Sequence, residues 1–116
     1  MPDGLPKAKE AKAIAGEVEG ATTVKAPFGT VFAQLLSLGR GLTRAFVYTD
    51  ALPENTISAT LHYRQGGGAW HELRDAIFPY EFSPPYTEGR GDLELAFEVE
   101  TAAQAIERAP AVTLRP

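Results

Sequence analysis

The sequence predicts an all-β protein, an antiparallel β-sandwich of six to seven strands preceded by an N-terminal arm. Three observations support this prediction. Short segments rich in β-branched and aromatic residues recur after residue 24, and Gly, Pro, Asp or Asn separates them. Residues 93–101 alternate between apolar and polar side chains, as a strand with one buried and one wet face does. The 116 residues, 44% of them hydrophobic, suit one domain with a packed core.

Residues 1–23 are the predicted arm and residues 24–116 the predicted sandwich domain. The first 20 residues contain no aromatic residue and few large aliphatic ones. Ile14 and Val18 lie four positions apart, which permits a weakly amphipathic helix, but a helix this short is marginal in water. Two interpretations stay open: a disordered or adventitious tail, and an extended or weakly helical arm that orders only on a partner.

Residues 28–41 suit either a strand or a helix. Phe28, Phe32 and the leucines at 35 and 36 have helical spacing, and Gly39 would end such a helix. We favour a strand, because a sandwich of six or seven strands needs this length of chain. Residues 43–49 follow as a strand that is apolar on both faces, as expected near the centre of a sheet.

The next two segments, 57–64 and 69–74, form a predicted hairpin around three consecutive glycines. Its first strand has an apolar face consisting of Ile57, Ala59, Leu61 and Tyr63. With the glycines as the loop, the opposing pairs are Leu61 with Leu73, His62 with Glu72, and Arg64 with Trp70. A loop over 65–68 would instead pair His62 with His71, but it would turn Glu72 toward the core, so we reject it.

Three segments complete the predicted sandwich. Residues 78–89 contain three prolines, so they form an edge strand or an extended crossing between the sheets. Strand 93–101 turns its apolar face inward, and residues 111–115 form the last strand. The expected core consists mainly of Leu61, Leu73, Leu95, Phe97, Val99, Val112 and Leu114.

Residues 43–115 resemble bacterial immunoglobulin-like and fibronectin type III-like domains. The resemblance rests on the strand "ISATLHYR", a Gly-rich hairpin leading to Trp70, the strand "GDLELAFEVE", the small-residue loop "TAAQAIERAP" and the final "AVTL". It implies an immunoglobulin-like sandwich, a fold that serves as spacer, binding module or surface decoration. The chain departs from this pattern: it has no cysteine pair, no tyrosine on strand 93–101, and Trp70 follows the hairpin loop.

Composition and motifs exclude several functions. The net charge of −4, with Lys and Arg scattered along the chain, argues against nucleic-acid binding. The chain has no cysteine and no apolar run long enough to span a bilayer. Neither a catalytic set nor a phosphate loop is present, so we expect no enzyme, metal or cofactor. Arg90-Gly91-Asp92 spells an adhesion tripeptide, but we interpret it as a turn into strand 93–101.

The function expected from these observations is non-enzymatic: a decoration or assembly component of a larger particle, such as a phage virion. It would bind a protein partner or further copies of itself, docking partly through its arm. The alternative is a carbohydrate-binding or spacer module of a larger secreted protein. The first 20 residues lack the apolar centre of a signal peptide. We therefore expect synthesis in the cytoplasm with incorporation in a virion, or an extracellular location if the chain belongs to a secreted protein.

Candidate partner-binding residues lie in two places. The arm offers two aliphatic side chains and lysines, namely Ile14, Val18, Lys9 and Lys12. The Pro-rich segment offers aromatic side chains, and those that are not buried in the core would contact a partner. These candidates are Phe78, Tyr80 and Tyr86.

Overall fold

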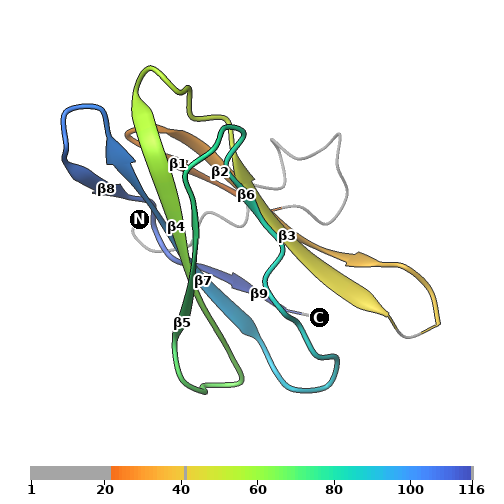
Figure 1. Cartoon of the computed structure of the whole chain (residues 1–116). Coiled ribbons are helices and arrows are strands. Elements are labelled where there is room, and N and C mark those ends of the chain that lie inside the picture. The colour runs from red at the N-terminus through yellow and green to blue at the C-terminus, as the bar shows by residue number, and fades with distance from the viewer. Residues whose placement is uncertain (1–21, 41, 116) are drawn as a thin grey trace.

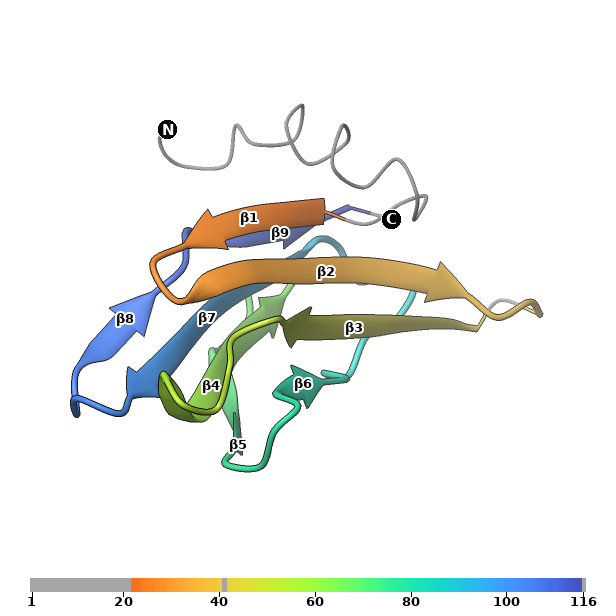
Figure 2. The same cartoon turned by 90° about the horizontal axis from the view of Figure 1, so that it is seen from above.

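The computed structural model describes residues 22–40 and 42–115, which form two antiparallel sheets packed together (Figures 1 and 2). The first sheet has the order β1 (Thr22–Ala26), β2 (Gly29–Ser37), β3 (Thr43–Thr49) and β6 (Glu81–Phe82). The second has the order β5 (His71–Asp75), β4 (Thr56–Gln65), β7 (Leu93–Thr101) and β8 (Ile106–Arg108). β9 (Val112–Leu114) also pairs with β7, at the opposite end of that strand from β8. The predicted all-β sandwich is confirmed.

The described residues contain nine strands rather than six or seven. The prediction lacks β1 and β8, which have five and three residues and are too short for an alternating pattern to be recognised in the sequence. β8 lies inside the segment expected to be a loop. β1 begins at Thr22, so Thr22 and Thr23 belong to the sandwich and not to an arm ending at residue 23.

The core lies between the inner faces of the two sheets. Leu61, Leu95, Phe97 and the other predicted core residues are buried, except that Leu73 is only partly buried on the edge strand β5. β7 buries every second side chain from Leu93 to Val99, as its alternation predicts. Residues 28–41 form mainly strand β2, which settles that ambiguity in favour of the strand.

β4 departs from its predicted pattern at its first residues. Ile57 was expected on the buried face, but its side chain is 45% exposed, whereas Thr56 and Ser58 are buried. The register with β7 shifts between Thr56 and Ser58, which marks a β-bulge. A bulge adds one residue to one strand and changes which side chains point inward.

The hairpin of β4 and β5 has the predicted register. Leu61 pairs with Leu73 and His62 with Glu72. Gly66 and Gly67 have positive φ angles of 62° and 75°, which favour glycine. Gly66 also donates its N–H to the Asp92 carbonyl, so the hairpin loop packs against the loop that precedes β7.

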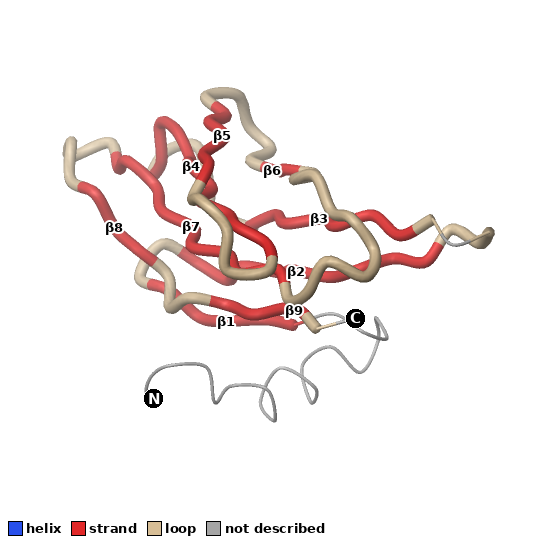
Figure 3. Tube along the Cα trace, turned by 90° about the horizontal axis from the view of Figure 1, so that it is seen from below, coloured by secondary structure: helices blue, strands red, loops and turns tan. Residues whose placement is uncertain are grey.

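The Pro-rich segment crosses from one sheet to the other. Its short strand β6 lies at the edge of the first sheet, beside β3, and the following residues lead back to β7 in the second sheet (Figure 3). Both alternatives expected for residues 78–89 therefore occur in one segment. β3, with β2 on one side and β6 on the other, is an interior strand as predicted.

Candidate functional site

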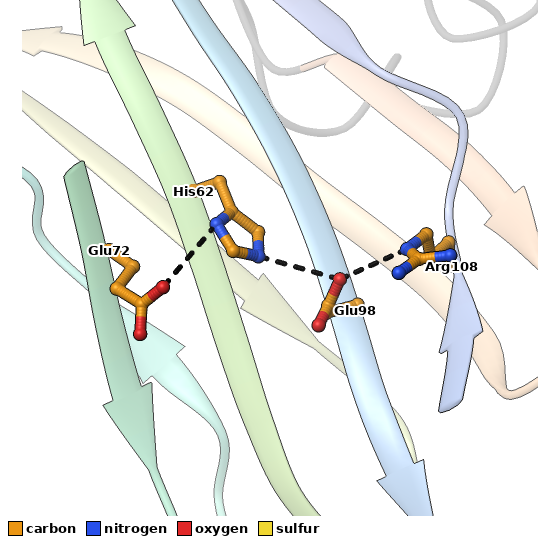
Figure 4. Close-up of polar contacts among 4 residues, drawn as sticks. All are labelled: His62, Glu72, Glu98 and Arg108. Atoms are coloured by element: carbon orange, nitrogen blue, oxygen red, sulfur yellow. Dashed lines mark hydrogen bonds and ion pairs between the residues drawn. The ribbon is translucent and has the colours of Figure 1, made fainter. Parts of the chain in front are cut away.

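The outer face of the second sheet is polar. Four side chains form a row across β5, β4, β7 and β8 (Figure 4). His62 Nδ1 lies 3.8 Å from Glu72 Oε1, and His62 Nε2 lies 3.4 Å from Glu98 Oε1. Arg108 Nε donates to the same Glu98 oxygen at 3.1 Å. The row follows from the strand register, which places His62 opposite Glu72 and Glu98 opposite Arg108.

A second polar pair on this face, Arg64 with Glu94, lies next to Trp70, the only tryptophan of the chain. Arg64 donates from Nε and Nη2 to the two carboxylate oxygens of Glu94, each at 3.0 Å. The Arg64 guanidinium carbon lies 4.7 Å from the centre of the Trp70 ring, which confirms the predicted pairing of these side chains. Trp70 is 47% exposed and borders a hollow of about 320 Å³ that His62 and Glu98 also line.

The outer face of the first sheet has the opposite character. Every second residue of β2 and β3 points outward, and the series continues into the turn, where Leu38 N–H donates to the Leu42 carbonyl at 2.7 Å. We call this surface the hairpin face. It consists of Phe32, Gln34, Leu36, Leu38, Leu42, Arg44, Phe46 and Tyr48.

Apolar groups dominate the hairpin face. The rings of Phe32 and Tyr48 stack with their centroids 4.9 Å apart. Leu38 and Leu42, at the tip of the hairpin, are 55% and 52% exposed. Figures 2 and 3 show this tip extending beyond the rest of the sandwich. A groove of about 450 Å³ runs along the face toward β6, where Glu81 lines it.

Sequence reasoning missed the hairpin face as a site, although the signal was present. β3 was recognised as apolar on both faces. In a two-layer sandwich only one face of a strand meets the core, so the second apolar face must lie on the outside. The uncertainty between strand and helix for residues 28–41 hid the matching side chains of β2.

The three aromatic residues expected to bind a partner do not form one surface. Phe78 is 46% exposed and meets the ring of Tyr80 edge-on, with centroids 5.9 Å apart. Tyr80 is a correction: it is 2% exposed and its hydroxyl donates to the Thr56 carbonyl at 2.7 Å, so it belongs to the core. Burial, with a smaller contribution from Asp75, raises the pKa of Tyr80.

Tyr86 is partly buried at the end of the sandwich. It lines a cavity of about 500 Å³ with Leu35, Glu88 and Arg115, and its buried hydroxyl oxygen has no hydrogen-bond partner among the described residues. Burial, followed by the nearby Glu88 and Asp92 carboxylates, raises the pKa of Tyr86. The four predicted arm residues Ile14, Val18, Lys9 and Lys12 lie outside the described residues.

The tripeptide Arg90-Gly91-Asp92 lies in the turn before β7, as predicted. Gly91 has a φ angle of 100°, and the Asp92 carboxylate accepts a hydrogen bond from Arg115 at 3.3 Å. The acidic residue of the tripeptide is therefore already paired with a basic residue of the same chain.

Within residues 22–40 and 42–115, no three His, Cys, Asp or Glu side chains are grouped closely enough to hold a metal ion. The same part of the chain contains no helix with the length and apolarity needed to cross a membrane. Comparison with family models, curated proteins and solved structures gave no match for this chain.

Proposed function

We propose that this chain is a non-enzymatic structural protein that docks into a larger protein assembly, such as a phage particle. The observation that supports this proposal most strongly is the hairpin face. Arg44 is its only charged residue, and two half-exposed leucines form its tip. An outer sheet face on which apolar side chains predominate is typical of a protein contact.

The polar face of the second sheet supports the non-enzymatic part of the proposal. Its His62 is flanked by two carboxylates, Glu72 and Glu98, and Glu98 is also held by Arg108. This row links polar side chains of four strands, and its partly exposed members keep the outer face of the sheet in contact with water. The resemblance of residues 43–115 to immunoglobulin-like domains agrees with a decoration or spacer role, and residues 1–20 would supply a second point of attachment.

The test is incorporation into the assembly. The full chain is co-expressed with the proteins encoded beside it in its genome, and sedimentation separates large particles from free protein. We expect Leu38→Lys/Leu42→Lys to leave the chain in the free fraction. The matched control is Leu52→Lys/Ile106→Lys, because these side chains are 52% and 51% exposed on other parts of the surface.

Two outcomes would contradict the proposal. In the first, the unaltered chain never enters a particle. In the second, the hairpin variant enters the particle as efficiently as the control variant. Because all four altered side chains are half exposed, we expect both variants to fold like the unaltered chain, which circular dichroism verifies.

A second candidate function, carbohydrate binding, is supported by the hollow beside Trp70. An exposed indole next to an imidazole and a carboxylate offers a stacking surface and hydrogen-bonding groups. Since Trp70 is the only tryptophan, its fluorescence reports binding directly. Titration with a panel of oligosaccharides should change this emission if the hollow binds sugar. An unchanged emission at about 10 mM of every sugar would exclude this function at any useful affinity.

A further inference from the structure

We propose that the occupant of the hairpin face is a second copy of this chain, packed face to face about a two-fold axis. This inference depends on the proposed function, because it names the partner of the same surface. The observation that supports this inference is the order of the outward side chains along the hairpin.

The register between β2 and β3 arranges the hairpin face in rows. From the body of the sandwich to the tip, the pairs are Phe32 with Tyr48, Gln34 with Phe46, Leu36 with Arg44, and Leu38 with Leu42. Glu81 of β6 pairs with Tyr48 and extends the first row. The rows therefore change from aromatic and acidic at one end to aliphatic and basic at the other.

A two-fold axis between the second and third rows brings unlike rows together. The tip leucines of each copy then cover the stacked rings of Phe32 and Tyr48 on the other copy. Arg44 of each copy meets the ring of Phe46 on the other, where a guanidinium is attracted to an aromatic face.

Charge favours the same arrangement. The tip carries Arg40 and Arg44, and the first row ends in Glu81, and all three residues are exposed. Antiparallel packing places the basic tip of one copy near Glu81 of the other, and it does so at both ends of the interface. Parallel packing would place Arg44 against Arg44, and like charges across an interface disfavour association.

The size of the surface sets the strength of the contact. Adjacent rows are two residues apart, so four rows extend for about 20 Å, and three strands are about 14 Å wide. The strip is smaller than one side of a standard interface, so we expect a weak and reversible dimer. Dimer should become populated between about 0.1 and 1 mM chain, or at lower concentration where an assembly holds copies side by side.

The experiment is sedimentation velocity on the full chain over a range of concentrations up to about 1 mM. We expect the sedimentation coefficient to rise with concentration. Leu38→Lys/Leu42→Lys and Arg44→Glu should each weaken association at least tenfold, and Leu52→Lys/Ile106→Lys should leave it unchanged. Arg44→Glu/Glu81→Lys should restore part of the association that Arg44→Glu loses, because the tip of one copy and the first row of the other again carry opposite charges.

Three results would overturn the inference. The chain sediments as a monomer throughout, the hairpin variants associate as the unaltered chain does, or removing residues 1–20 abolishes association that the hairpin variants retain. Failure of the inference is distinguishable from failure of the proposed function. If the chain is monomeric but its Leu38→Lys/Leu42→Lys variant still fails to enter the particle, the inference is wrong and the proposed function stands. The hairpin face then binds a different protein.

Discussion

The outer faces of the two sheets differ in chemical character: one is crossed by paired polar side chains, and the other consists mainly of apolar ones. On the second sheet, side chains pair with one another across every strand boundary, from Glu72 to Arg108. On the first sheet, the outward side chains of β2 and β3 are mainly aromatic and aliphatic. A two-layer sandwich needs apolar residues only between its sheets, so its outer faces are free to be polar. The hairpin face therefore has a chemistry that folding alone does not require.

The two faces also differ in what their contacts contribute to free energy. Exposed ion pairs each contribute between 0 and about 1 kcal/mol, and salt weakens them. The polar face therefore serves solubility more than stability. Apolar surface contributes about 25 cal/mol for each Å² removed from water, so covering the hairpin face would drive association. The comparison teaches that the polar face is already satisfied by contacts within the chain and with water, whereas the hairpin face is the surface through which we propose that the chain docks.

The largest effect is expected in the core that lies behind both faces. Leu95→Ala removes a side chain that is 2% exposed and should lower the free energy of unfolding by about 2–5 kcal/mol. Urea unfolding measures this difference. A cost below about 1 kcal/mol would mean that the inner layer is not the source of stability.

A smaller effect is expected from the aromatic stack on the hairpin face. Phe32→Ala removes a partly buried ring that stacks on Tyr48, and we expect a loss of about 1–2 kcal/mol in urea unfolding of the monomer. Phe32→Leu is the control, since it keeps most of the apolar volume and loses only the stack. A loss as large as that of Leu95→Ala would contradict the view that this ring lies outside the core.

The next effect depends on pH. Burial raises the pKa of Tyr80 above its ordinary value, so its contribution to stability is fully present below about pH 10 and is lost as pH rises through the folded value. Tyr80→Phe should cost about 1 kcal/mol at pH 7, because the hydrogen bond to the Thr56 carbonyl is lost. The variant should also lose less stability than the unaltered chain between pH 9 and about 11. Parallel pH curves for the two proteins would show that Tyr80 does not ionise during this loss.

A still smaller effect is expected on the polar face. Glu98→Gln removes the charge that His62 and Arg108 share, and it should change the free energy of unfolding by less than about 1 kcal/mol. The difference should shrink in high salt. A salt-independent loss of several kcal/mol would show that this row is structural, and the contrast between the two faces would then fail.

Removing residues 1–20 should have the smallest effect on stability. These residues offer few large apolar groups with which to offset the entropy of ordering. We expect an almost unchanged melting temperature and a weaker attachment to the assembly, measured by calorimetry and by particle sedimentation. A melting temperature lowered by several degrees would place this segment in the domain. Unchanged attachment would show that it is only a tail.

Much of the fold could be predicted from the sequence, because alternation has a direct physical cause. Successive side chains of β7 point alternately into the core and toward water. The apolar and polar pattern from Leu93 to Val99 therefore shows which face of the strand is buried. The β4–β5 register followed from keeping Glu72 out of the core. The bulge at Ile57 could not be predicted, because no residue type in this segment indicates that one additional residue is inserted into the strand.

The candidate site was harder to predict, because it depends on which segments meet in space. Tyr80 was expected on the surface, but its burial depends on β4, 24 residues earlier in the chain, whose Thr56 accepts its hydrogen bond. The hairpin face combines alternate residues of β2 and β3, and it emerges only when both segments are known to be strands. Local sequence patterns contain neither relation.

The most direct test of the central claim is hydroxyl-radical footprinting of the assembled and the free protein, because it labels both faces in one sample. Exposed aromatic and aliphatic side chains react, and a docked partner protects them. We predict that Leu38, Phe46 and Tyr48 lose most of their labelling on assembly, whereas Trp70 and Ile57 on the second sheet keep theirs. Protection of Trp70 with undiminished labelling of Tyr48 would contradict the claim and assign docking to the polar face.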